Sequence, residues 1–182
     1  MTYYITAWTP TGIITGTGFT PDGTLPQGAI VCTKEQAKNA SQYVVDTSTI
    51  PPTVVNAPSA ILLAQAQSAQ IALLQSAFEQ AEQAPISLTL ASGIITSFGM
   101  TPPDWTKIVG LYSKYVAKGI ALPSGYQIPD TNGTLQAVTV TDIENLFNAG
   151  ETQMTGAITK LASLVAQVQA ATTVADVQAV TW

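Results

Sequence analysis

The sequence has no histidine, no arginine and a single cysteine, Cys32. Histidine is the commonest general base and a frequent metal ligand, so its absence excludes Ser-His-Asp catalysis, Cys-His catalysis and most zinc sites. One cysteine cannot form an intrachain disulfide, and the apolar residues beside Cys32 favour a buried thiol. We therefore expect no enzymatic activity, no cofactor and no metal.

Charge is scarce as well. Charged residues make up 9% of the chain, whereas a typical soluble domain has roughly 25%. All six basic residues are lysines, and eleven acidic residues bring the net charge to -5. The one local group of cations, Lys107, Lys114 and Lys118, has the spacing of a solvated helix face rather than of a phosphate-binding patch. Nucleic-acid binding is therefore not expected.

Long apolar runs are missing too. No segment approaches the roughly 20 apolar residues that a membrane span requires. The first residues, 1–5, lack the basic and apolar regions of a secretion signal. We therefore expect synthesis in the cytoplasm and no insertion into a membrane.

Uncharged residues take the place of the missing charges. Hydrophobic residues form 46% of the chain, and Thr, Ser, Gln and Asn must supply most of its polar surface. Such a surface costs little to desolvate when another protein docks, because no ion has to leave water. A surface adapted to remain inert is the alternative. The composition favours a structural or assembly protein that acts through protein–protein contacts.

Residues 1–55 are predicted to form a small β-rich N-terminal unit. Aromatic and β-branched runs flank the turn at Pro10-Thr11-Gly12, which is typical of a hairpin. Thr33 and Gln36 fit a capping box that opens a short helix. Further short strands are expected at 29–32 and 43–46, and Pro51-Pro52 is expected to end the unit in a linker that runs to residue 57.

Residues 56–85 are predicted to form a connecting helix. The run 59–84 contains no Gly and no Pro, and its apolar residues follow two heptad lines, which indicates a coiled-coil seam. An ordinary amphipathic helix is the alternative, because Leu62, Leu63 and Leu73 widen the apolar stripe. The candidate oligomer seam in this helix consists of Ala64, Gln67, Ile71, Leu74 and Phe78.

Residues 86–182 are predicted to form a C-terminal α+β domain. It would hold a hairpin around Ser92-Gly93, a helix from 101 to 119, two strands around the turn at Asn132-Gly133, and a final short helix leading to a packed Trp182. A capping box at 141–144 would open a long helix to about 171, in which Gly150 and Gly156 allow a neighbour to approach closely or mark a bend. The heptad line of this helix extends the candidate seam with Phe147, Met154, Leu161 and Val168. The whole chain is thus predicted to be α+β.

Two stretches resemble known proteins. The opening, MTYYITAWTPTGIITGTGFTPDGTLPQGAIVCT, resembles the N-terminal region of small proteins encoded among the tail-fibre and baseplate genes of tailed bacteriophages. The segments ISLTLASGIITSFGM, LPSGYQIPDTNGTLQAVTVTDIENLF and ATTVADVQAVTW are similar to an uncharacterised domain family from the same phage tail modules. The resemblance implies a structural protein of the virion tail, at the baseplate or the tail-fibre attachment, whose partners are other tail proteins.

Fibre symmetry would make this protein a homo-oligomer, with a trimer as the expected state. Two other functions fit the same features. One is a tail-fibre assembly chaperone that is absent from the mature virion. The other is a receptor-binding tip that uses the aromatic residues Tyr3, Tyr4 and Trp8.

Overall fold

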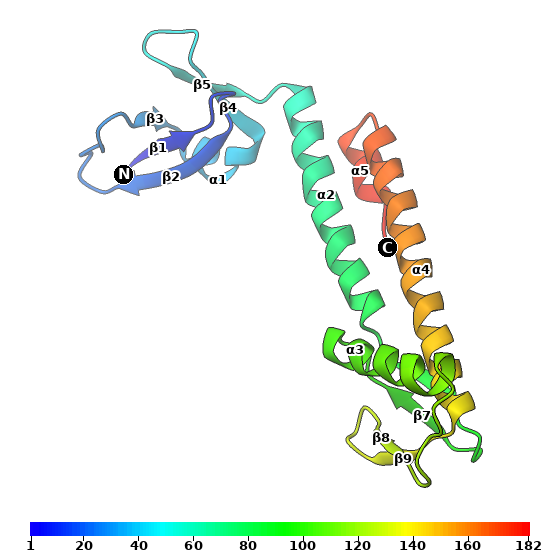
Figure 1. Ribbon diagram of the computed structural model, residues 1–182. Coiled ribbons are helices and arrows are strands. Elements are labelled where there is room, and N and C mark those ends of the chain that lie inside the picture. The colour runs from blue at the N-terminus through cyan, green and yellow to red at the C-terminus, as the bar shows by residue number, and fades with distance from the viewer. The chain divides into compact units, whose positions relative to one another are not determined.

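The computed structural model describes all residues, 1–182, and confirms the α+β class. Its strands form four separate small antiparallel sheets, and its two longest helices are α2 and α4 (Figure 1). None of the helices is both long and apolar enough to span a membrane. The elements are β1 (Thr2–Trp8), β2 (Ile14–Thr20), β3 (Ile30–Cys32), α1 (Lys34–Lys38), the 3-10 turn η1 (Ala40–Gln42), β4 (Tyr43–Asp46), β5 (Thr53–Asn56), α2 (Ser59–Glu82), β6 (Ile86–Thr89), β7 (Ile95–Phe98), α3 (Pro102–Leu111), the π-helical turn η2 (Tyr112–Ala117), β8 (Gln127–Pro129), β9 (Leu135–Ala137), α4 (Val140–Ala170) and α5 (Val174–Ala179).

The chain divides into two compact units. Unit 1 consists of Met1–Ser68 and Thr172–Val177, and unit 2 consists of Ala69–Ala171 and Gln178–Trp182. The boundary falls within α2, so that this helix contributes a turn or more to each unit. Whether 56–85 also acts as a separate connecting part, as we expect from its sequence, stays a prediction.

Unit 1 is built around the predicted N-terminal hairpin. Strand β1 pairs with β2 on one side and with β3 on the other, both antiparallel. Ile5 in β1 is fully buried, and Ile14 and Val45 complete a small core beneath the sheet. Cys32 lies half-buried at the edge of this core, where burial raises the pKa of its thiol. The thiol thus packs against the core, as predicted, but it is only partly buried.

The predicted short helix of unit 1 is confirmed with its cap. The hydroxyl of Thr33 accepts a hydrogen bond from the backbone N–H of Gln36 at 3.1 Å, and the side-chain carbonyl of Gln36 accepts one from the backbone N–H of Thr33 at 2.8 Å. Both bonds of a capping box are thus present, which explains why a helix of only five residues forms here.

The prediction of a linker after Pro52 is wrong. Residues Thr53–Asn56 form β5, which pairs with β4 in an antiparallel hairpin. Pro51 and Pro52 lie in the connection, ahead of the first paired residue, so they remove no bond from the ladder. Val54 packs against the core of unit 1, and this burial stabilises the strand.

Unit 2 contains two hairpins, β6–β7 and β8–β9, together with α3, η2 and α4 (Figure 1). Its core gathers one or two side chains from nearly every one of these elements. The helix that we predicted over 101–119 is present, and its last turns widen into η2 before Gly119 ends it with φ +63°. The buried core consists of Ile86, Leu90, Phe98, Met100, Ile108, Tyr115, Val138, Ile143 and Leu146.

The cap of the long helix lies two residues earlier than we predicted. Thr139, not Thr141, is the N-cap, and its partner in the capping box is Asp142 rather than Glu144. Asp142 is only 2% exposed, and it also accepts a hydrogen bond from the backbone N–H of Ala91 at 2.8 Å. In the helix that begins at Val140, Asp142 is buried and makes this bond.

One of the two helix glycines has the predicted role. A Cβ atom at Gly150 would lie 2.3 Å from the ring of Trp105, so α4 and α3 can approach closely only because this side chain is absent. No atom lies within 4 Å of the corresponding position at Gly156, and the helix continues unbroken through it. The prediction of a close approach is therefore confirmed for Gly150 and wrong for Gly156.

The end of the chain packs within unit 2, as predicted. Trp182 is half-buried, with its ring 6.4 Å from that of Phe78 in α2 and 4.8 Å from the ammonium group of Lys160 in α4. The side-chain amide of Gln70 donates a hydrogen bond to the carbonyl of Val180 at 2.6 Å. The last residues thus connect α2 and α4.

Candidate binding cleft

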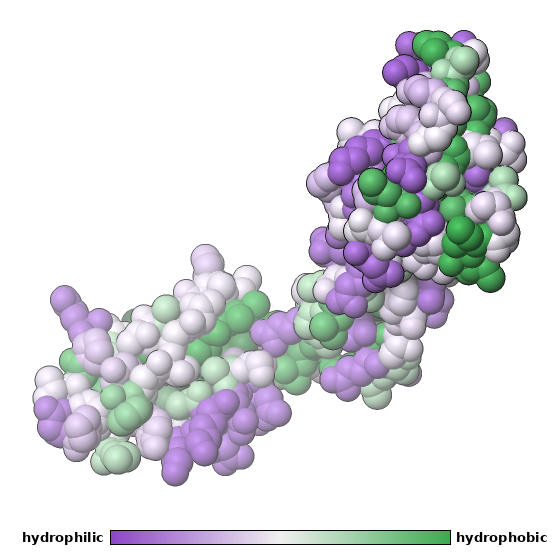
Figure 2. Space-filling model, turned by 90° about the horizontal axis from the view of Figure 1, so that it is seen from below, coloured by the Kyte–Doolittle hydropathy of each residue, from purple (hydrophilic) through white to green (hydrophobic).

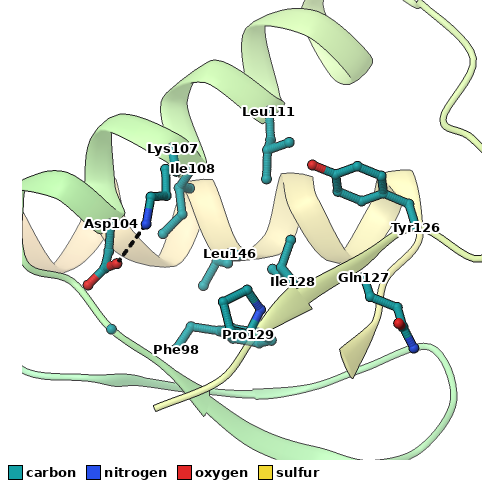
Figure 3. A pocket seen from close by; sticks show the side chains of 11 residues that line it. Phe98, Asp104, Lys107, Ile108, Leu111, Tyr126, Gln127, Ile128, Pro129 and Leu146 are labelled. Atoms are coloured by element: carbon teal, nitrogen blue, oxygen red, sulfur yellow. Dashed lines mark ion pairs between the residues drawn. The ribbon is translucent and has the colours of Figure 1, made fainter. Parts of the chain in front are cut away.

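Unit 2 has an open cleft of about 280 Å³ between α3 and β8, with α4 behind it (Figure 3). Helix periodicity places Ile108 and Leu111 of α3 on one side. Alternation along the strand places Tyr126 and Ile128 opposite them. Leu146 of α4 closes the back of the cleft. The full lining is Phe98, Gly99, Asp104, Lys107, Ile108, Leu111, Tyr126, Gln127, Ile128, Pro129 and Leu146.

The charges at the cleft belong to a single ion pair. The Lys107 ammonium lies 3.8 Å from the Asp104 carboxylate, and both side chains reach solvent. The hydroxyl of Thr101 donates a further hydrogen bond to Asp104 at 2.5 Å. A Cβ at Gly99 would lie 2.6 Å from the same carboxylate, so the glycine leaves room for it. The two charges satisfy each other, and the interior of the cleft remains uncharged.

Strand β8 is held in place by the turn that follows it. The carboxylate of Asp130 accepts hydrogen bonds from the backbone N–H groups of Asn132 and Thr134 and from the side chains of Thr96 and Gln136. Burial alone would raise the pKa of Asp130, but these four hydrogen bonds outweigh it and lower that pKa below its ordinary value. The turn therefore fixes the wall of the cleft that β8 supplies.

The chemistry available in the cleft is that of apolar binding. Most side chains that line the cleft are apolar. The polar groups among them include the Asp104–Lys107 ion pair and the Tyr126 hydroxyl, which points into the cleft in Figure 3. Nowhere in the chain do three or more His, Cys, Asp or Glu side chains gather as metal ligands would. Sites for drug-sized ligands measure roughly 300–1,000 Å³. At about 280 Å³, the cleft lies at the lower end of that range.

The first half of the predicted oligomer seam follows α2 across both units. Ala64 is exposed and Gln67 is half-buried in unit 1. In unit 2, Ile71 is half-buried and Leu74 is 1% exposed, while Phe78 lies against the C-terminal Trp182. Most of these side chains are therefore covered by the chain itself.

The second half of the seam follows α4. The ring of Phe147 stacks between those of Trp105 and Tyr112, at centroid distances of 5.4 and 3.9 Å. Val168 is fully buried, whereas Met154 and Leu161 are half-buried. An oligomer that used Phe147 would have to break an intramolecular aromatic stack. The seam as a whole stays a prediction.

The aromatic residues predicted for a receptor-binding tip also have contacts within unit 1. Trp8 packs against the core of the unit, and the ring of Tyr3 lies 6.1 Å from that of Phe19. Tyr4 lies directly over Gly18, where a Cβ would come within 2.7 Å of its ring. Each of the three aromatic side chains therefore makes a packing contact within unit 1.

The sequence did not reveal the cleft. Its lining residues had the periodicity of core positions, and the spacing of Ile108 and Leu111 is the same whether a helix face is covered or open. Nothing in the order of residues shows that α3 and β8 stand apart. Comparison of the chain with protein-family models, with curated proteins and with solved structures finds no match.

Proposed function

We propose that this protein is a structural component of a bacteriophage tail, at the baseplate or the tail-fibre attachment, and that it acts through protein–protein contacts. The observation that carries the proposal is that a charge-poor chain exposes large apolar side chains on both of its units. Those of unit 1 include Phe19 (58% exposed) and Ile50 (99%), and those of unit 2 include Ile95 (75%), Leu73 (64%) and Ile158 (55%).

The polar surface around these side chains supports the same role. Figure 2 shows purple hydrophilic residues interspersed with pale and green ones over the face in view. Only 9% of the residues are charged, so docking would expel few ions from water. Depletion of charged residues is a feature of the buried cores of protein interfaces.

The tail context rests on the resemblance of residues 1–33 and of the C-terminal segments to phage tail-module proteins. That resemblance favours a virion location, other tail proteins as partners, and assembly as a homo-oligomer, with a trimer as the expected state. The absence of histidine and arginine favours a contact-making role over catalysis.

Mass spectrometry of purified virions tests the proposal. A structural component should be recovered with the tail proteins after the particles have been banded in a density gradient and washed in high salt. A protein that is abundant in infected-cell lysate but missing from the washed particles would contradict the proposal and favour an assembly chaperone.

A further inference from the structure

The cleft between α3 and β8 reaches into the core of unit 2. Three of the side chains that line it, Leu146, Phe98 and Ile108, also belong to the buried core and are only 2%, 3% and 5% exposed. A helix or an extended strand of another protein binds along an elongated surface groove, whereas a recess that ends on core side chains takes a compact ligand. The depth of the cleft therefore favours a small molecule as its occupant.

The volume of the cleft sets the size of that molecule. An apolar cavity of about 150 Å³ in a protein core is large enough to hold benzene. The cleft measures about 280 Å³. At the same density it has room for one substituted ring, of roughly ten non-hydrogen atoms.

The charges of the cleft favour a neutral ligand. Asp104 and Lys107 are its only charged lining residues, and they pair with each other at 3.8 Å. A ligand ion would lose part of its hydration shell in the cleft without meeting an unpaired opposite charge. Apart from Tyr126 and Gln127, the remaining lining side chains are apolar. The ligand that fits is therefore neutral and mainly apolar.

Tyr126 offers this ligand one polar contact. Its hydroxyl points into the cleft (Figure 3), and no other group of the chain makes a hydrogen bond with it. The ring packs against that of Tyr115 at a centroid distance of 5.7 Å, and the carbonyl of Tyr126 accepts a hydrogen bond from the backbone N–H of Val138 at 3.1 Å. The hydroxyl is thus held in place, and it can donate a hydrogen bond to a ligand or accept one from it.

We propose that the cleft is a binding site for a small neutral molecule that has an apolar ring and one hydrogen-bonding group, and that this group meets the Tyr126 hydroxyl. The hydrogen bonds of Asp130 fix the strand that carries the cleft wall, so binding requires little ordering of the protein. The inference goes beyond the proposed function, since a subunit that acts through protein–protein contacts has no need of such a site.

Two probes that differ by a single hydroxyl, 4-ethylphenol and ethylbenzene, test the site. Each is titrated into the full chain labelled with nitrogen-15, and the backbone amide resonances are followed by NMR. Both probes should bind saturably and shift the resonances of the residues that line the cleft. Tyr126→Phe should weaken the binding of 4-ethylphenol by roughly three- to tenfold, which is the effect of losing one neutral hydrogen bond. The same substitution should change the affinity for ethylbenzene by less than about twofold, because ethylbenzene has no group to meet the hydroxyl.

Two further variants complete the experiment. Tyr43→Phe removes a hydroxyl from a half-buried tyrosine of unit 1, far from the cleft in the sequence, and should leave both affinities unchanged. Leu111→Trp fills the cleft and should abolish the binding of both probes. The amide spectrum of each variant verifies that it is folded, and the comparison at Tyr126 does not depend on Leu111→Trp.

Two results would overturn the proposal. If neither probe shifts the cleft resonances up to its limit of solubility, the cleft takes no small apolar molecule and is left to a side chain of a protein partner. If Tyr126→Phe affects both probes equally, its hydroxyl has no part in recognition. Neither result depends on virions, so the tail role and this binding site succeed or fail separately.

Discussion

At the scale of single residues, Gly150 and Gly156 of α4 differ in the space around them. A Cβ atom at Gly150 would collide with the ring of Trp105, whereas one at Gly156 would have no atom within 4 Å. A methyl group at the first position must push an aromatic ring out of a stack, while at the second it meets nothing. The pair therefore separates tertiary packing from intrinsic helix propensity.

Gly150→Ala should destabilise the protein by about 1–3 kcal/mol, because the clash with Trp105 exceeds the gain in helix propensity. Gly156→Ala should stabilise it by about 0.5–1 kcal/mol, since alanine restricts the unfolded backbone and fits the helix. Urea denaturation followed by circular dichroism measures both. Equal effects of the two substitutions would show that the packing at Gly150 is not tight.

Three turn aspartates, Asp22, Asp46 and Asp130, accept hydrogen bonds that lower their pKa values; those of Asp130 outweigh the effect of its burial and include bonds from Thr96 and Gln136 on neighbouring strands. A carboxyl whose pKa is lower in the folded state stabilises the fold above its ordinary pKa of 3.8, and that contribution is lost as the pH falls through the lowered value. The chain has no histidine to titrate near neutrality. Stability should thus be nearly constant from about pH 8 to 5 and fall below about pH 4.

The denaturation midpoint measured against pH tests this expectation. Asp130→Asn should lower the midpoint at pH 7 and make the decline below pH 4 shallower, because the charged acceptor of four hydrogen bonds is gone. Glu151→Gln, which removes an exposed acid on α4, is the matched control and should leave the profile unchanged. An acid limb that is as steep in Asp130→Asn as in the wild type would contradict the assignment.

At the scale of elements, the start of α4 depends on one buried carboxylate. Asp142 accepts hydrogen bonds from the backbone N–H and the hydroxyl of Thr139, at 2.8 and 2.7 Å, and from the backbone N–H of Ala91. It therefore caps the helix and ties the β6–β7 hairpin loop to it.

Asp142→Ala should cost about 2–4 kcal/mol, because it removes a helix cap and leaves a partly buried backbone N–H without a partner. Asp142→Asn, which keeps one acceptor oxygen, should cost less. Glu144→Ala removes an exposed acid two residues later and should change stability by less than about 0.5 kcal/mol. Thermal unfolding by calorimetry compares the three variants. A larger loss of stability for Glu144→Ala than for Asp142→Ala would contradict the cap at Thr139 and favour the predicted cap at Thr141.

The elements were predictable where local chemistry decides them. The first hairpin, the capped helix α1, the long helices and the β6–β7 hairpin follow from periodicity, turn residues and caps. Strand β5 was missed because the two prolines just before it predict a linker. The strand forms because it pairs with β4 and because Val54 packs against the core of unit 1, which the local sequence does not show. The cap at Thr139 was missed because Thr141 offers the same local pattern, and the sequence does not show that Asp142 accepts a hydrogen bond from the backbone N–H of Ala91.

The candidate site was less predictable than the fold. The heptad lines identified side chains that need covering, but they could not show that Trp182, Trp105 and Tyr112 of the same chain would cover Phe78 and Phe147. The cleft depends on the separation between α3 and β8, which no residue pattern encodes.

At the scale of the whole molecule, Trp182 packs against both α4 and the part of α2 that belongs to unit 2. The ring of Trp182 lies between Phe78 of α2 and Lys160 of α4. Trp182→Ala should lower the free energy of unfolding by about 1–3 kcal/mol, less than for a fully buried tryptophan, and Trp182→Phe should recover part of the loss. Chemical denaturation measures both, and an unchanged midpoint for Trp182→Ala would show that the chain end contributes nothing to the unit.

We propose that this charge-poor chain is a permanent subunit of a tail rather than a transient assembly factor. Copy number in purified particles, measured by mass spectrometry against isotope-labelled peptides of this chain and of the major tail protein, tests it most directly. A permanent subunit should be present in a fixed whole number of copies per tail, a multiple of three, in every preparation. A copy number near zero, or one that varies between preparations and falls with washing, would contradict it.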